Sequence, residues 1–201
     1  NVQSVVIFPP ARHPVLWKIW FDWMLPKALK KHCIDVLFSP ESYVSLRTDL
    51  PQVSVIHDIN YMHNLKLLKA SHRRYMFRYT PLFAQKAKHI LTVSDFSKQE
   101  IIEHLCVEPR KIEVCYNGLS SIFIEQKPQQ SPWHKPYFLV VGALNPRKNI
   151  EGVLQAFELY RSENSDADLI FIGSKSHWTA SMERQFQGSK FKNAIFCGNF
   201  G

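Results

Sequence analysis

Short apolar runs alternate along the chain with longer stretches in which apolar residues recur every three or four positions. The short runs predict strands, and the three-to-four-residue recurrence predicts amphipathic helices. We expect strands at 5–8, 34–40, 52–58, 89–94, 111–118, 137–141, 168–173 and 194–198. We expect helices at 15–32, 65–88 with a break at Pro81, 97–105 with a Ser97–Glu100 capping box, 150–161 and 177–187. Strands that alternate with helices predict an α/β fold built on parallel sheets.

A polar segment at 125–136 interrupts this alternation. It reads EQKPQQSPWHKP, contains three prolines and shows no periodicity, so it predicts a linker. The linker separates an N-terminal domain at 1–124 from a C-terminal domain at 137–201. Parallel sheets bind ligands beyond the carboxyl ends of their strands. The residues that follow each strand are therefore the candidates for a functional site.

The turn between the strand at 137–141 and the next helix carries two cations. Gly142 ends the strand, Arg147 and Lys148 follow, and Asn149 is placed to cap the helix. The start of a helix offers unpaired N–H groups and the positive end of the helix dipole, a combination that binds phosphate. The alternative is that Arg147 and Lys148 are ordinary solvated turn residues. The local pattern does not separate these two interpretations.

Polar residues follow three of the expected N-terminal strands. His57 and Asp58 follow one strand, and an imidazole there could act as an acid, a base or a hydrogen-bond donor. A His-Asp pair taken alone is more typical of a satisfied turn. Ser94 ends the next strand, and Asn117-Gly118 ends another in a pattern that is also typical of a plain turn.

Composition adds positive charge without choosing a partner. The formal net charge is +8 and the pI is about 9.4, which suits a phosphorylated ligand, an acidic membrane surface or a nucleic acid. The four cysteines form no CxxC pair, and no histidine joins them at zinc-ligand spacing, so we expect free, mostly buried thiols in a reducing compartment. There is no signal-peptide pattern and no apolar stretch near the roughly 20 residues that cross a bilayer. We expect a cytoplasmic protein, with peripheral contact at the inner face of an anionic membrane as one option.

Two basic stretches bear on these partners. The segment 15–31 mixes three tryptophans with lysines, so it could touch an anionic membrane. The favoured interpretation is a core-facing helix with Leu16, Ile19, Trp20, Trp23 and Met24 on one side. The helix at 65–88 interleaves basic and aromatic residues, as a nucleic-acid site would. Aromatics at helical spacing more often pack in a core, so we disfavour nucleic acid. The chain has no P-loop, GxGxxG or GxSxG motif, and thus lacks the signatures of P-loop kinases, dinucleotide dehydrogenases and serine hydrolases.

Five strand-end segments, taken in order, indicate a protein family more specifically than any one of them alone. They read VSVIHDINYMHN, HILTVSDFSKQEII, KIEVCYNGLSSIF, FLVVGALNPRKNIEGVLQAF and LIFIGSKSHW. This series resembles the family 4 glycosyltransferases of the GT-B fold, closest to their mannosyltransferase-like members, over nearly the whole chain. The resemblance implies two Rossmann-like parallel-sheet domains facing a cleft, both incomplete in this chain. The first would bind a glycan or lipid-linked acceptor, and the second a GDP- or UDP-linked sugar donor.

The resemblance also implies roles for individual residues. Arg147 and Lys148 match the family's basic pair that holds the donor diphosphate, and His57 matches a histidine that contacts the transferred sugar. Gly142 would let the backbone approach the donor. The remaining expected donor-side residues are Asn149 and Gly173, and the expected acceptor-side or cleft residues are Asp58, Ser94, Asn117 and Gly118. The reaction implied is retaining transfer of a hexose, mannose favoured, with no metal or other cofactor.

The sequence departs from the family pattern in two ways. Many members carry Arg directly after the glycine, where this chain has Ala143, so Arg147 is expected to supply the charge. The family's paired-glutamate motif is expected about one strand and one helix after Gly201, and its opening strand and glycine-rich acceptor loop are expected before Asn1. We therefore interpret the chain as an internal fragment that could be inactive alone. Two alternative functions stay open, a GT-B nucleotide-sugar epimerase and a non-catalytic basic nucleic-acid-binding module.

Overall fold

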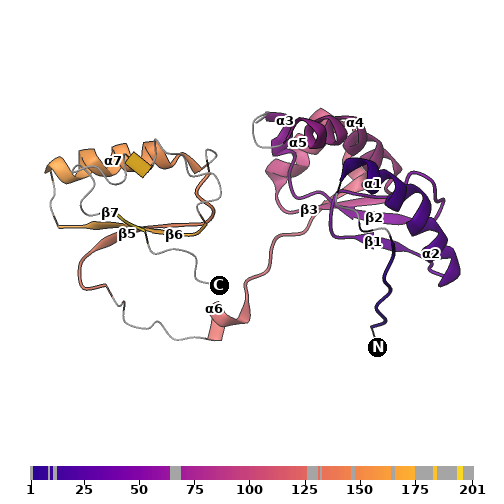
Figure 1. Ribbon diagram of the computed structural model, residues 1–201, viewed down its shortest axis with the longest axis horizontal. Coiled ribbons are helices and arrows are strands. Elements are labelled where there is room, and N and C mark those ends of the chain that lie inside the picture. Colours follow the sequence, from indigo (N-terminus) through magenta and orange to yellow (C-terminus); the bar gives the residue numbers. More distant parts are fainter. Residues whose placement is uncertain are drawn as a thin grey trace. The chain divides into compact units, whose positions relative to one another are not determined.

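The chain forms two compact units, Asn1–Ile124 and Glu125–Gly201. The computed structural model (Figure 1) describes residues 2–8, 10, 13–63, 69–125, 131, 133–145, 148–163, 166–174, 183–184 and 194–196. Within that part of the chain, no helix is both long and apolar enough to cross a membrane. Cys33, Cys106 and Cys115 are free thiols, as expected, but all three are exposed, so the expectation that the thiols are mostly buried is wrong.

The first unit contains a four-stranded parallel sheet in the order β1-β2-β3-β4. The strands are β1 (Leu37–Ser39), β2 (Gln52–Val55), β3 (His89–Thr92) and β4 (Ile112–Val114). Its helical segments are α1 (Pro14–Ile19), a π-helix (Trp20–Met24), α2 (Leu25–Lys31), α3 (Asn60–His63), α4 (Ala70–Lys86), α5 (Asp95–Leu105), a 3-10 turn (Pro109–Lys111) and α6 (Ser121–Glu125). Helix α4 contacts α1, α3 and α5 (Figure 1). Because all four strands are parallel, their carboxyl ends meet at one edge of the sheet.

Two apolar clusters hold the first unit together. One joins the sheet to the helices through Ile56, Ile90, Ile101, Leu105 and Ile112. The other is aromatic: Trp17 packs on Tyr43 and Tyr75 with ring centroids 5.4 and 5.3 Å apart, and Phe83 closes the cluster. This cluster fixes α1 against α4.

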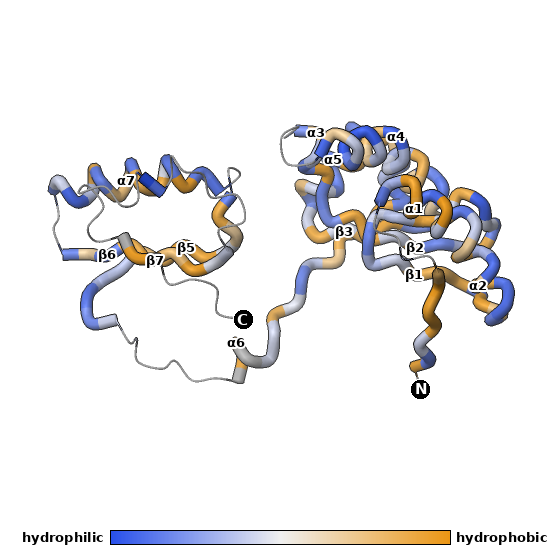
Figure 2. Tube along the Cα trace, viewed as in Figure 1, coloured by the Kyte–Doolittle hydropathy of each residue, from blue (hydrophilic) through white to orange (hydrophobic). Residues whose placement is uncertain are grey.

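The second unit contains a three-stranded parallel sheet in the order β5-β6-β7, with α7 along one face (Figure 1). The elements are β5 (Tyr137–Val141), α7 (Ile150–Glu163), β6 (Asp168–Ile172) and β7 (Ala194–Phe196). In Figure 2 the strands are mostly hydrophobic, whereas α7 alternates between hydrophilic and hydrophobic turns. The apolar face of α7 meets the sheet through Ile150, Leu154 and Phe157, which pack with Leu169 and Phe171. The expected α/β fold on parallel sheets is confirmed.

Three expectations about individual elements are wrong. Residues 5–8 form no strand. Helix α4 continues through Pro81, because buried residues before and after it, Tyr75 and Phe83, pack into the core and outweigh the lost hydrogen bond. The helix expected at 97–105 begins at Asp95, because Ser94 rather than Ser97 is its N-cap. Of the helix expected at 177–187, only residues 183–184 are described, and they are helical.

The expected inward face of the first helix is only partly correct. Leu16, Trp20 and Met24 are half-buried, but Ile19 and Trp23 are exposed. The buried residues of this helical stretch are Pro14, Asp22, Leu25 and Leu29. A π-helix forms its hydrogen bonds from i to i+5 instead of i to i+4, so each hydrogen-bonded loop contains one residue more than in an α-helix. That extra residue within Trp20–Met24 rotates the following face away from the position that a regular 3.6-residue period predicts.

Candidate functional site

The carboxyl edge of the first sheet brings together the residues predicted there. His57 follows β2 after Ile56, whose N–H continues the ladder by donating to the Leu91 carbonyl oxygen at 2.8 Å. The His57 side chain is exposed, and its Nε2 lies 3.1 Å from the carbonyl oxygen of Pro40, which follows β1. The imidazole is therefore positioned across two neighbouring strand ends.

Asp58 and Ser94 are both held by the starts of helices. The Asp58 carboxylate accepts a hydrogen bond from the Asn60 N–H at 3.0 Å. The Ser94 hydroxyl oxygen accepts one from the Ser97 N–H at 3.1 Å and so caps α5. These contacts give both residues a structural role at the edge where a ligand is expected.

The loop after β4 carries Asn117 and Gly118, and both are exposed. Just before them, the Tyr116 hydroxyl donates a hydrogen bond to the Asp95 carboxylate. This hydrogen bond and the negative charge of Asp95 raise the pKa of the Tyr116 phenol above its usual range. The contact ties the loop after β4 to the first turn of α5.

The carboxyl edge of the second sheet is shaped by two glycines. Gly142 and Gly173 follow β5 and β6, with φ angles of 126° and 150° that favour glycine. A Cβ atom on Gly173 would lie 1.9 Å from the Gly142 carbonyl oxygen. The ladder continues beyond both glycines, since the Leu144 N–H donates to the Ser174 carbonyl oxygen at 2.9 Å. The two strand ends can approach this closely only because Gly173 carries no side chain.

Lys148 and Asn149 connect this edge to α7. The Lys148 side chain passes over Gly142, with Cε 3.8 Å from the position that a Cβ would take on that glycine. Lys148 is exposed, and no carboxylate of the described residues pairs with it. Asn149 lies in the left-handed region at φ 46°, and its side-chain oxygen accepts a hydrogen bond from the Gly152 N–H at 3.3 Å, as expected for a helix cap. Arg147 lies outside the described residues.

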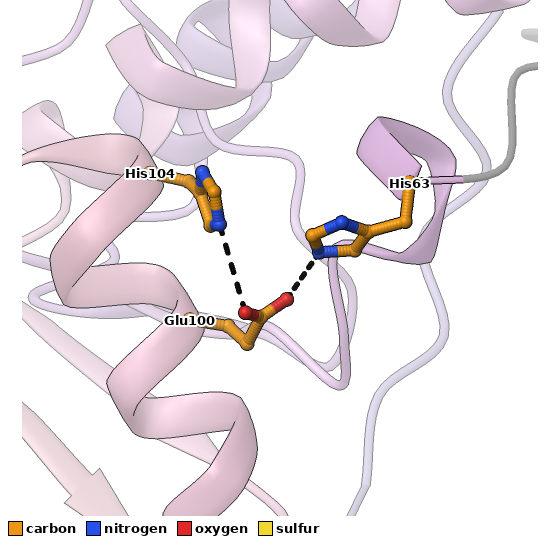
Figure 3. A group of neighbouring side chains, drawn as sticks. All are labelled: His63, Glu100 and His104. Carbon is orange, nitrogen blue, oxygen red and sulfur yellow. Dashed lines mark hydrogen bonds and ion pairs between the residues drawn. The ribbon is translucent and has the colours of Figure 1, made fainter.

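The structure also places together three side chains that the sequence analysis missed. His63, Glu100 and His104 lie side by side, with each carboxylate oxygen of Glu100 facing one imidazole (Figure 3). The Glu100–His104 spacing of four residues on a helix was a usable signal. His63 is 37 residues from Glu100, so only the fold could reveal it.

Comparison with known proteins identifies the family. Residues 1–121 match Glycosyltransferase Family 4, and residues 122–199 match Glycosyl transferases group 1. O-antigen chain mannosyltransferase RfbU of Salmonella typhimurium is 24% identical over 97% of this chain and 52% of its own length. O-antigen chain mannosyltransferase B of Escherichia coli is 32% identical over 68% of this chain and 38% of its own length. The chain thus spans about half or less of the length of these relatives.

Solved structures resemble the chain over most of its length. TarM covers 93% of it with a TM-score of 0.58 and 15% identity, over 36% of the TarM chain. The lipopolysaccharide outer core galactosyltransferase WaaB covers 94% with a TM-score of 0.58 and 14% identity, over 49% of its own chain. A glycosyltransferase from Rickettsia africae covers 98% with a TM-score of 0.59 and 14% identity, over 55% of its chain. These neighbours have the GT-B fold, and with the family match over residues 1–121 they confirm the expectation from the strand-end motifs: this chain belongs to glycosyltransferase family 4.

Proposed function

We propose that this chain is part of a retaining glycosyltransferase that transfers a hexose, with mannose favoured, from a nucleotide-diphosphate sugar to a glycan or lipid-linked acceptor. The family match and the two relatives named as O-antigen chain mannosyltransferases support the reaction class and the sugar. The nucleotide is GDP or UDP, and the reaction requires no metal or other cofactor.

The edge formed by Gly142, Gly173 and Lys148 is the observation that carries this proposal. Gly142 is half-buried and carries no side chain, and the buried Gly173 lets the neighbouring strand end approach it closely. The exposed Lys148 side chain passes over Gly142 next to the start of α7. This combination suits the diphosphate of a donor. As the bond between sugar and diphosphate breaks, negative charge grows on the leaving phosphate, and fixed cations stabilise the charge where it develops. We assign that role to Lys148 and, from the family motif, to Arg147.

Residues of the first unit would act on the sugar and the acceptor. His57 would hydrogen-bond the transferred hexose, because its exposed imidazole is held at the carboxyl edge of the sheet. Asp58, Ser94, Asn117 and Gly118 share that edge and would shape the acceptor side. Asp58 and Ser94 are already engaged with backbone N–H groups, so they would position loops more than contact ligand.

A hollow in the first unit that is lined by both basic and aromatic side chains supports contact with an anionic membrane. It lies between α1 and α4 and is lined by Trp23, Tyr75 and Tyr79 together with Lys18, Arg74 and Arg78. Arginines beside aromatic side chains are suited to lipid headgroups. Vesicles containing anionic lipid should bind the wild type, and an Arg74→Glu, Arg78→Glu double variant should bind much less, whereas Lys98→Glu on α5 should change little. Equal binding by all three would remove this surface from the proposal.

The central test is Lys148→Ala in the full-length enzyme. Turnover should fall about a hundredfold or more, which is the effect of losing one group that stabilises developing charge. Lys148→Arg keeps the charge and should retain far more activity, and Lys135→Ala is a control outside the site. Unchanged kinetics in Lys148→Ala would remove Lys148 from the mechanism.

The donor can be identified on the same protein. A thermal-shift panel of GDP, UDP and ADP sugars should show stabilisation by one nucleotide class, and that shift should shrink in Lys148→Ala. Conversion of the donor without any acceptor would instead indicate an epimerase. Indifference to every nucleotide sugar, together with salt-sensitive binding to RNA or DNA, would indicate a nucleic-acid-binding module.

A further inference from the structure

His63, Glu100 and His104 form a compact group in the first unit that the proposed reaction does not use. His63 is the last residue of α3, and Glu100 and His104 lie one turn apart on α5 (Figure 3). The group therefore bridges two helices that are distant in sequence. Two imidazoles and one carboxylate are ligands that first-row transition metals accept.

The ligand atoms of this group already converge. One Glu100 oxygen is hydrogen-bonded to His63 Nε2, the other lies 3.6 Å from His104 Nε2, and all the ligand atoms lie within 4.8 Å of one another. Tetrahedral zinc, with bonds of about 2.0–2.1 Å, separates its ligands by roughly 3.3–3.5 Å. The largest separation must therefore shrink by little more than 1 Å, which side-chain rotation can supply.

The surroundings of the group favour a cation. The Glu100 side chain is only 17% exposed, whereas the His63 and His104 side chains are 50% and 40% exposed, so an ion and a bound water could enter from the imidazole side. Within the described part of the chain, the only ion-pair partners of Glu100 are these two imidazoles. His104 lies in the last turn of α5, where the helix presents partial negative charge.

We propose that His63, Glu100 and His104 bind a zinc ion through one imidazole nitrogen each and one carboxylate oxygen, with water completing the coordination. The ion would tie α3 to α5. Helix α3 begins at Asn60, whose N–H donates to the Asp58 carboxylate, so the ion would also restrain the segment that carries His57. This proposal concerns a structural site and does not depend on the proposed transfer reaction.

A proton-stabilised cluster is the competing explanation for the same geometry, because a carboxylate between two histidines can also share protons. Zinc binding requires unprotonated imidazole nitrogens, so the metal should release protons and its affinity should fall as the solution is acidified. A cluster that only binds protons would show no saturable zinc uptake.

Zinc titration of the chelator-treated full-length protein tests the proposal. We expect one tight equivalent by calorimetry, and Co²⁺ substituted at the site should give the visible absorption of a low-coordinate complex. His104→Ala and Glu100→Gln should each weaken this equivalent about tenfold or more. Far-ultraviolet circular dichroism would show whether these variants fold, and His63→Ala is a further variant outside α5.

Two control variants separate this site from other zinc-binding groups. His89→Ala removes a histidine that pairs with Glu113 at 3.3 Å but belongs to no three-ligand group among the described residues. The zinc affinity of this variant should equal that of the wild type. Cys106→Ser removes the exposed thiol just after α5 and should also leave the affinity unchanged. Absence of a tight equivalent, or wild-type affinity in both His104→Ala and Glu100→Gln, would overturn the proposal.

Hydrogen exchange gives a second readout that does not depend on activity. Zinc should slow exchange of the backbone amides of 57–63 and of the end of α5 in the wild type and in His89→Ala. At a zinc concentration that just saturates the wild type, exchange in Glu100→Gln should slow much less. Equally slowed exchange in all three proteins would mean that zinc acts elsewhere.

Discussion

Strands β2 and β5 have opposite compositions and opposite burial. Half of β2 is polar, yet Gln52 and Ser54 are 1% and 0% exposed. All five residues of β5 are apolar or aromatic, yet Leu139 and Val141 are 48% and 63% exposed. β2 lies between β1 and β3, whereas β5 is an edge strand of the described sheet with α7 along one face. Burial of a strand thus depends on its neighbours as well as on its own residues.

The buried polar groups of β2 are tolerated because they are paired. The Gln52 side chain accepts a hydrogen bond from the Ser45 N–H and donates one to the Ser45 carbonyl oxygen, both at 2.8 Å. The Ser54 hydroxyl donates to the Glu41 carbonyl oxygen at 3.2 Å. Side chains of β2 therefore form hydrogen bonds with backbone groups of the loop after β1, and these buried polar side chains hold that loop against the sheet.

The strongest contrast concerns the glycines at the strand ends. Gly173→Ala should destabilise the second unit by about 4 kcal/mol, because its Cβ would meet the Gly142 carbonyl oxygen and its φ is positive. Gly118→Ala, after β4, has no heavy atom within 4 Å of the new Cβ and should cost little. Urea unfolding followed by circular dichroism would measure both. Equal stability of the two variants would show that the β5–β6 approach is not tight.

Truncation of one apolar residue in each sheet tests the difference in burial. Ile90→Ala on β3 should cost about 3 kcal/mol, because Ile90 is fully buried. Leu139→Ala on β5 should cost less than about 1 kcal/mol, because half of that side chain already meets solvent. The same unfolding experiment compares them, and hydrogen exchange assigns each loss to its unit. A cost for Leu139→Ala as large as for Ile90→Ala would mean that β5 is covered in solution.

Loss of the Gln52 amide tests the polar side of the comparison. Gln52→Ala should cost about 2 kcal/mol, because it leaves the buried Ser45 N–H and carbonyl without partners. Gln85→Ala on the exposed surface of α4 is the matched control and should be close to neutral. The measurement is the urea midpoint of each variant. A neutral Gln52→Ala would show that water replaces the amide in that loop.

The smallest effect concerns the Tyr116–Asp95 contact. The hydrogen bond to the Asp95 carboxylate and the charge of that carboxylate raise the pKa of Tyr116, so Asp95→Asn, which weakens the hydrogen bond and removes the charge, should lower that pKa toward its usual range. In the wild type, the stability from this contact is fully present below the ordinary tyrosine pKa and is lost as the pH rises through the raised value. Ultraviolet titration of tyrosine ionisation would detect the change, with Glu103→Gln as the control on the same helix. An unaltered titration in Asp95→Asn would mean that the hydrogen bond does not persist in solution.

Most elements could be predicted from periodicity because local pattern and tertiary role agree in them. The strand expected at 137–141 is β5, and the helix expected at 150–161 is α7, Ile150–Glu163. The helix break predicted at Pro81 was wrong because the local rule for proline does not include the packing of Tyr75 and Phe83. The exposure of β5 was not predictable, since it depends on which segments cover the sheet.

Candidate site residues were predictable where they follow a strand. Gly142, Gly173 and His57 all lie at carboxyl edges, where parallel topology had placed them. The complete group of proposed zinc ligands was not predictable: the spacing of Glu100 and His104 was a usable signal, but His63 meets Glu100 only through the packing of α3 near α5. Arg147 lies outside the described residues, so its role stays a prediction.

The single extra residue in the π-helix Trp20–Met24 makes the register of the first helix sensitive to length. Each residue advances a helix by about 100°. Deleting one residue from this segment would restore a regular helix and rotate the preceding turn about the helix axis by about that angle. Trp17 would then lose its contacts with Tyr43 and Tyr75. The π-helical turn therefore sets the rotation between the helix face before it and the face after it, and lets one continuous helix pack both faces.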